Sequence, residues 1–214
     1  MLRIRLLNTL PSVFADEKIP ASDIWKSEMT FVKGEKYLVE AESGGGKSSM
    51  CAYIFGARTD YQGEILFDDK NIREIGISAW LKLRRESLAY LPQELSLFPE
   101  LTALENIRLK NILTGYASDA MISDWMDRLG IAFRSNFPVG KMSIGQQQRV
   151  AIIRSLCQPF DFLLIDEPVS HLDNTNNDIA AALISEVAER QGAGIICTSV
   201  GNHLHLDYTR RLKL

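Results

Sequence analysis

Three consecutive glycines followed by a lysine and two serines form the stretch of the sequence best suited to chemistry. Gly44, Gly45 and Gly46 follow an apolar run ending at Val39 and precede Lys47. Glycine adopts backbone angles closed to other residues, so successive N–H groups can line a concave anion-binding nest. A strand, a glycine turn and a helix N-terminus are together typical of a phosphate-binding loop. We expect the loop to bind phosphate through Ser43, Gly44, Gly45, Gly46, Lys47, Ser48 and Ser49.

The side chains at the end of this loop fit a triphosphate with magnesium. Lys47 would place a positive charge beside the β- and γ-phosphates, and the Ser48 hydroxyl would be a Mg²⁺ ligand. The pattern G-x-x-x-x-G-K-[ST] is not met at its first position, where Ala41 stands. Alanine costs on the order of 1 kcal/mol there if the position needs a positive φ, and little if it does not.

A pair of acidic residues follows an apolar segment later in the chain. Asp166 and Glu167 come directly after Phe162–Ile165, which the pattern predicts to be a buried strand. In open α/β sheets, ligands bind at the carboxyl ends of the strands. We therefore expect Asp166 to support Mg²⁺ and Glu167 to orient and deprotonate an attacking water.

Length and composition limit the class of protein. The 214 residues suffice for one sizeable core, so we expect a single domain over 1–214. The net charge of −3 offers no basic footprint for nucleic acid. No apolar run approaches the ~18 residues needed to cross a bilayer. The three cysteines lie far apart without metal-ligand spacing, which predicts buried free thiols in a reducing cytosol.

Alternating apolar strands and helices predict an α/β fold whose mostly parallel sheet is covered on both faces. Strands are expected at 1–7, 24–32, 63–69, 88–91, 162–165, 194–198 and within 207–214, and 8–23 is expected to be a loop. Helices are expected at 50–55 and 78–86, and helical signals dominate 102–156. Thr102 and Glu105 form a capping-box pattern, and Asn174 or Thr175 is the expected N-cap of the last long helix.

Three further segments complete a recognisable set of motifs. Met142–Val150 reads M-S-I-G-Q-Q-Q-R-V, Tyr90–Gln93 reads Y-L-P-Q, and Ser170–Asp173 reads S-H-L-D. With the phosphate loop and the acidic pair, they resemble in order the signature, Q-loop and D-loop of ABC-type ATPases. The resemblance covers about residues 24–200, and 97–107 resembles the lipoprotein-release and macrolide-export branch. It implies a P-loop NTPase fold with an N-terminal antiparallel β subdomain and an inserted helical subdomain at about 94–156.

The resemblance also implies a function and partners. The chain would bind and hydrolyse ATP with Mg²⁺, and it would power a separate transmembrane permease from the cytoplasmic face of the cell membrane. The permease would dock near Gln93 and 97–111, and no nucleic acid is expected. The implied catalytic residues are Glu167, Lys47 and Gln93, and the implied Mg²⁺ ligands are Ser48, Gln93 and Asp166. The residues that would cap the γ-phosphate held by a second copy, in a homodimer, are Ser143, Gly145 and Gln146.

Two departures from the family pattern leave alternatives open. Ile144 replaces the first glycine of the signature, and Ser199 and Val200 stand where the family usually has a histidine beside the γ-phosphate. A regulatory module that dimerises on nucleotide with weak or no hydrolysis therefore remains a second hypothesis, and a soluble member acting on DNA or ribosomes a third. His203 either bends back into the site or lies on the surface. Phe14 is the candidate for stacking on adenine, or it anchors a loop on the core. The sequence does not identify the transported substance.

Overall fold

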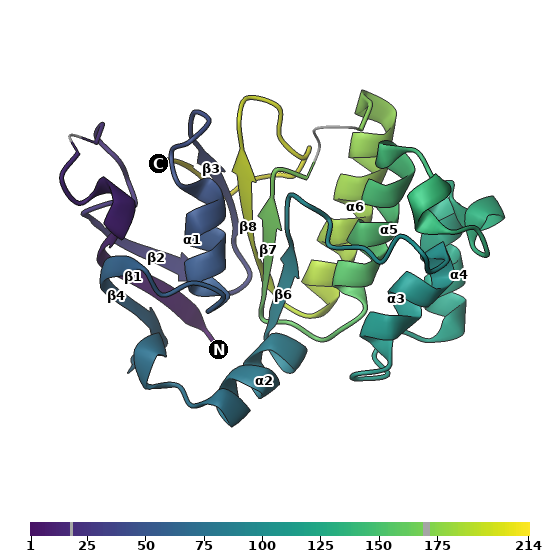
Figure 1. Cartoon of the computed structure of the whole chain (residues 1–214), viewed down its shortest axis with the longest axis horizontal. Helices are drawn as coiled ribbons and strands as arrows, with labels where there is room; N and C mark the ends of the chain where they lie inside the picture. The colour runs from purple at the N-terminus through teal and green to yellow at the C-terminus, as the bar shows by residue number, and fades with distance from the viewer. Residues whose placement is uncertain (18, 169–171) are drawn as a thin grey trace.

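The computed structural model describes residues 1–17, 19–168 and 172–214, which form two β-sheets flanked by helices (Figure 1). The five-stranded parallel sheet has the order β6-β7-β8-β3-β9, and a four-stranded antiparallel sheet has the order β2-β1-β4-β5. The parallel strands are β3 (Lys36–Glu40), β6 (Leu88–Leu91), β7 (Phe162–Asp166), β8 (Gly194–Ser199) and β9 (Arg210–Lys213). The antiparallel strands are β1 (Arg3–Pro11), β2 (Glu28–Val32), β4 (Tyr61–Phe67) and β5 (Lys70–Asn71). The expected fold class, with its N-terminal antiparallel sheet, is confirmed.

The α-helices of the described chain are α1 (Lys47–Ile54), α2 (Ile77–Glu86), α3 (Ala103–Asn111), α4 (Asp119–Arg128), α5 (Ile144–Leu156) and α6 (Asn174–Arg190). Side chains that accept from free backbone N–H groups fix several helix starts. The capping box of Thr102 and Glu105 opens α3 as the sequence predicted. The N-cap prediction for α6 was wrong, because the Asp173 side chain accepts from the Asn176 N–H and Asn174 is already helical.

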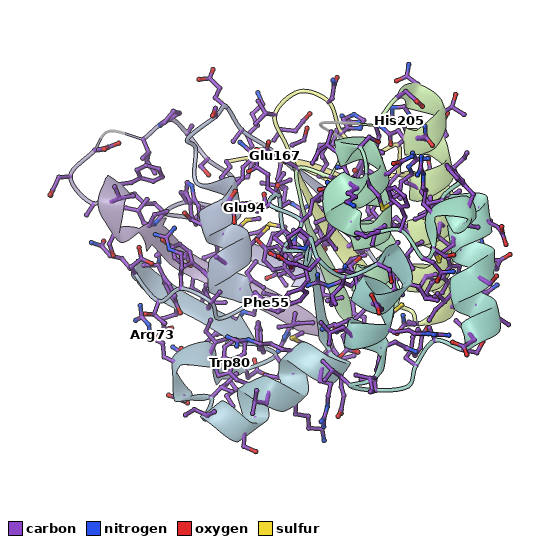
Figure 2. The ribbon with its side chains drawn as sticks, turned by 45° about the vertical axis from the view of Figure 1, so that its right-hand side comes forward. Phe55, Arg73, Trp80, Glu94, Glu167 and His205 are labelled. Carbon is purple, nitrogen blue, oxygen red and sulfur yellow. The ribbon has the colours of Figure 1, made fainter. Side chains whose placement is uncertain are left out.

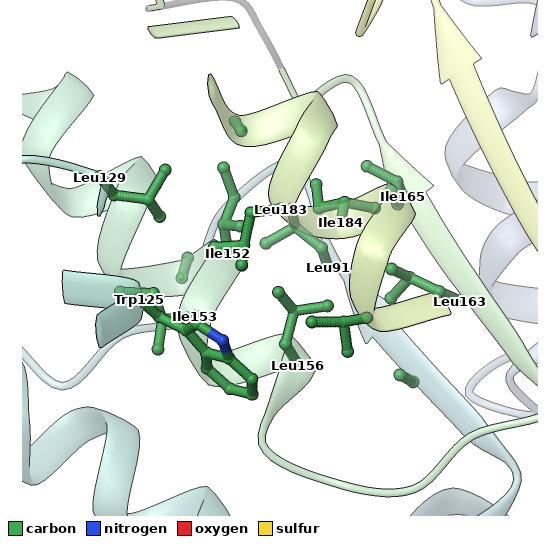
Figure 3. Packing of buried hydrophobic residues seen from close by; sticks show 14 of the residues in the cluster. Leu91, Trp125, Leu129, Ile152, Ile153, Leu156, Leu163, Ile165, Leu183 and Ile184 are labelled. Atoms are coloured by element: carbon green, nitrogen blue, oxygen red, sulfur yellow. The ribbon is translucent and has the colours of Figure 1, made fainter. Parts of the chain in front are cut away.

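The core has two parts, one on each face of the parallel sheet. On one face, α5 and α6 pack against β6, β7 and β8, and Figure 3 shows Ile152, Leu163 and Leu183 in this packing. On the other face, α1 and the antiparallel sheet pack against residues such as Val39 and Leu164. Alternate residues of each strand therefore serve different clusters, which fixes the strand register.

Strand register places the carboxyl ends of three parallel strands together. Glu40 of β3 pairs with Ser199 of β8, and Asp166 of β7 pairs with Thr198 of the same strand. Because β8 lies between β3 and β7, the loops after these two strands emerge at one edge of the sheet. Both chemically important segments of the sequence begin at that edge.

The strand predicted at 1–7 is present as part of β1, but two neighbouring segments differ from expectation. Residues 8–11, predicted as loop, continue β1 to Pro11 after a register shift at Asn8, whose φ is 49°. Asn8 can take this left-handed conformation because Gly63 opposite it has no side chain, and a Cβ there would lie 2.3 Å from the Asn8 carbonyl oxygen. The strand predicted at 24–32 begins only at Glu28, because the Ser22 hydroxyl accepts from the N–H groups of Ile24 and Trp25 and holds a turn.

Two further observations concern the cysteines and the helices outside the site. Cys51, Cys157 and Cys197 are buried and free, as predicted. Within the part of the chain that the structure describes, no helix is both long and apolar enough to cross a membrane.

Candidate active site

The glycine turn joins the end of β3 to the start of α1 and has the backbone of an anion nest. Gly44 and Gly46 have φ values of 83° and 93°, and Gly46 is the N-cap of α1. Ala41 is absent from the described residues with positive φ. The departure of the chain from the phosphate-loop pattern at this position therefore carries no backbone strain.

Ala41 and Gly45 fit each other within this turn. A Cβ added to Gly45 would lie 3.0 Å from the Ala41 methyl carbon and 3.2 Å from the Glu42 carbonyl oxygen. The alanine methyl thus occupies space that a side chain at position 45 would need. The Ala41 methyl and the Glu42 carbonyl oxygen therefore both favour glycine at position 45.

Lys47 is buried at the start of α1 and directs its amine back across the turn. Its Nζ donates to the carbonyl oxygens of Ala41 (3.1 Å) and Glu42 (2.8 Å) and lies 3.4 Å from Glu167 Oε1. Ser48 is exposed beside it, whereas the Ser49 hydroxyl accepts from Arg58 Nη1 at 2.9 Å. The lysine amine is therefore held by two backbone carbonyl oxygens of the turn and lies beside one carboxylate.

The acidic pair at the end of β7 is held by Thr198 of the neighbouring strand. The Thr198 hydroxyl donates to Asp166 Oδ1 at 2.6 Å and accepts from the Glu167 N–H at 3.3 Å. Asp166 is 1% exposed, while Glu167 has the left-handed φ of 49° and is labelled near the top of the molecule in Figure 2. A non-glycine residue in this region stores backbone strain, which proteins concentrate at functional sites.

Gln93 lies beyond β6 and is exposed. Leu91 of β6 pairs with Ile165 of β7, so the segment carrying Gln93 leaves the same edge of the sheet as Asp166. Leu95 and Ser96, just beyond it, have φ values of 57° and 50°. Two adjacent left-handed residues make a sharp change of direction between the sheet and α3.

The signature residues lie elsewhere. Ser143 and Gln146 form a capping box at the start of α5, with Gly145 in its first turn. Helix α5 packs on the face of the parallel sheet opposite to α1 (Figure 1). Ile144 is the first helical residue and 46% exposed, so a β-branched side chain meets no backbone conflict there. The structure thus brings together Lys47, Asp166 and Glu167 but not the signature residues.

The histidines and the D-loop are placed only in part. His203 packs edge-on against the Tyr208 ring, and its Nδ1 lies 3.1 Å from the Leu204 carbonyl oxygen, so its contacts are outside the phosphate loop. Ser170 and His171 of the D-loop lie outside the described residues, and Asp173 caps α6.

Aromatic residues line a 260 Å³ cavity beside the glycine turn. Phe14 and Trp25 form part of its wall together with the segment 42–45. Sequence reasoning singled out Phe14 but missed Trp25 and Thr198. The signals were present but ambiguous: a tryptophan in a short irregular segment, and a hydroxyl ending an apolar strand.

Comparisons with known proteins agree with this geometry. The sequence profile of the ABC transporter family matches residues 25–170. The chain belongs to this family, and it is an ATP-binding domain and an ATPase. Similar relatives include the lipoprotein-releasing system ATP-binding protein LolD of Shewanella denitrificans, 25% identical and covering 99% of this chain and 92% of the relative. LolD of Shewanella frigidimarina is 27% identical over 87% of this chain and 80% of its own length.

Two solved structures of similar fold are dimeric cassettes. The dimeric bacterial ABC transporter cassette MJ0796 is 26% identical with a TM-score of 0.75, covering 92% of this chain and 87% of that one. A dimeric post-hydrolysis state of the same cassette, bound to ADP and Pi, has a TM-score of 0.74 at 25% identity over 93% and 88% of the two chains.

Proposed function

We propose that the chain grips ATP in the loop 43–49 and hydrolyses it to drive a separate transmembrane permease. The observation that carries the site assignment is the 3.4 Å approach of Lys47 Nζ to Glu167 Oε1. It joins a phosphate-binding lysine and a candidate base at one edge of the sheet, above the N-terminus of α1. The relatives named as lipoprotein-releasing proteins support a place in that branch of the family.

The donors at this edge fit Mg²⁺. Proteins hold Mg²⁺ through one or two carboxylates, and substrate phosphates and waters complete its shell. Asp166 offers one buried carboxylate, and Ser48 and Gln93 each offer an oxygen. No group of three or more His, Cys, Asp or Glu side chains suited to a metal occurs in the described ranges, so the ion would depend on the nucleotide. When bound, it would offset charge on the phosphates.

Three residues of this chain have different roles in hydrolysis. Lys47 leaves the carbonyls of Ala41 and Glu42 to donate to phosphate oxygens, which frees the Glu167 carboxylate. Glu167, directed by its N–H bond to Thr198, then accepts a proton from the attacking water. Gln93 orients that water from the neighbouring strand end.

A second copy of the chain completes the site. The Ser143–Gln146 cap lies on the far face of the sheet from α1, so it is available to the phosphate held by another molecule. The N-terminus of a helix favours anions. The dimeric state of the MJ0796 cassettes supports a homodimer that closes over two ATP molecules.

The permease is proposed to dock where the helical subdomain, about 94–156, meets the rest of the single domain. A 320 Å³ cavity there is lined by the Q-loop residues Leu91 and Pro92 and by two cations, Lys110 and Arg154. Neither cation forms an ion pair within the described residues, although Arg154 Nη1 donates to the Ser96 carbonyl oxygen. An acidic side chain on the docking segment would neutralise them. This contact would hold the chain at the inner face of the cell membrane.

Two experiments test these assignments. Calorimetric titration should show ATP binding that Lys47→Ala abolishes, and unchanged affinity in that variant would contradict the site. For docking, a zero-length carbodiimide should join the Lys110 amine to a carboxylate of a membrane protein in native membranes. Lys110→Arg should keep the complex but lose this cross-link, and an intact complex without any Lys110 cross-link in the wild type would contradict the docking site.

A further inference from the structure

Trp25 contacts the phosphate loop through its indole ring. Its indole Nε1 donates to the Gly45 carbonyl oxygen at 3.1 Å, and the residue is only 4% exposed. The indole ring also lies 3.2 Å from the place a Cβ would take on Gly46. Trp25 is itself anchored, because the Ser22 hydroxyl accepts from its backbone N–H at 2.8 Å.

The glycine turn needs such a restraint. Three successive glycines have more conformational freedom to lose than any other sequence of that length. A trans peptide carries its C=O and N–H on opposite sides. Holding the Gly45 carbonyl toward the indole therefore turns the Gly46 N–H to the opposite side of the loop. Among the described residues, that N–H has no backbone acceptor, so it is available to an anion.

We propose that Trp25 is a positioning residue for phosphate binding: its indole N–H fixes the Gly45–Gly46 peptide so that the Gly46 N–H faces the phosphates. The inference rests on the proposed function, because it requires that the loop bind ATP. It gives Trp25 no contact with nucleotide. Trp25 acts through the loop, and its buried ring packs on Gly46 from the side where Phe14 also lies.

The test separates phosphate binding from base binding and from folding. Trp25→Phe keeps an aromatic ring but removes the N–H donor, and a benzothiophene analogue of tryptophan at position 25 removes the donor alone. The affinities for ATP and for inorganic tripolyphosphate should both fall about fivefold to tenfold, as expected for one lost hydrogen bond. Trp125→Phe is the matched control, because Trp125 is buried in the other core cluster and should leave both affinities unchanged.

Each other outcome overturns the inference. Weaker ATP binding with unchanged tripolyphosphate binding would mean that Trp25 contacts the base. Unchanged affinities with a lower melting temperature would make Trp25 a purely structural residue. If the wild-type chain bound neither ligand, and Lys47→Ala changed nothing, the proposed function itself would fail, which is a different result from a defect confined to the Trp25 variants.

Discussion

Lys47 Nζ and Glu167 Oε1 lie 3.4 Å apart and join the helix after the glycine turn to the strand end that carries the acidic pair. The lysine side chain is 3% exposed and the glutamate side chain 21%, so the lysine is shielded from solvent and the glutamate is partly accessible to it. An entering phosphate would compete with Glu167 for Lys47. Binding would therefore release the carboxylate at the moment when a water needs a base.

The fit between Ala41 and Gly45 predicts a double-mutant cycle. Gly45→Ala alone should destabilise the chain by about 1–3 kcal/mol, because the new methyl meets the Ala41 methyl at 3.0 Å. Ala41→Gly alone should cost less than ~1 kcal/mol, as expected for an added glycine. In the double variant, the part of the loss caused by the Ala41 methyl should be recovered in chemical denaturation, while the contact with the Glu42 carbonyl oxygen at 3.2 Å remains. Simple additivity would show that the two residues do not compete for space.

The two capping boxes allow the role of the signature to be isolated. Ser143→Ala and Thr102→Ala each remove a cap and should each cost about 0.5–2 kcal/mol of stability. Only Ser143→Ala should also weaken ATP-dependent dimerisation, because Ser143 faces the second copy in the proposed assembly. Sedimentation with ATP and a hydrolysis-deficient background measures this, and equal dimer affinities for both variants would remove Ser143 from the interface.

The buried cysteines should be unreactive in the folded chain. Burial raises the pKa of the Cys157 and Cys197 thiols to about 12 and that of Cys51 well above its ordinary value. Since the thiolate is the reactive form, a disulfide reagent at mildly alkaline pH should modify none of them quickly. All three should react at once in guanidinium, and a full equivalent reacting in the native chain would show an open thiol.

Lys110 should destabilise the free chain. Burial, and then the nearby Arg154, lower the pKa of Lys110, so its charged form is disfavoured in the folded state. The penalty is present below the lowered pKa and disappears as the pH rises toward the ordinary lysine pKa of about 10.4. Lys110→Met should therefore raise the melting temperature near neutral pH and lose that advantage at alkaline pH. Lys141→Met, at an exposed position, is the control, and a lower melting temperature for Lys110→Met would show an internal role for the lysine.

The reach of sequence reasoning differs between the parallel sheet and the rest of the molecule. The apolar strands, the glycine turn and Asp166-Glu167 stand out because buried parallel strands and phosphate loops have strong local patterns. The β1 bulge at Asn8 depends on a partner strand that is distant in the sequence, and the Asp173 cap depends on one choice among adjacent polar residues. Trp25 and Thr198 act through contacts with residues 20 and 32 positions away, which no local pattern reveals.

The most direct measurement is phosphate release by Glu167→Gln protein with saturating ATP and Mg²⁺. Glutamine keeps the shape of the side chain but cannot accept the proton of the attacking water. We expect hydrolysis to fall by about 100-fold or more, the range of a lost general base. The Kd for ATP should not rise, because Lys47 no longer pairs with a carboxylate that competes with phosphate. Turnover at the wild-type rate would show that Glu167 is not the base and that the pairing of Glu167 with Lys47 has no role in catalysis.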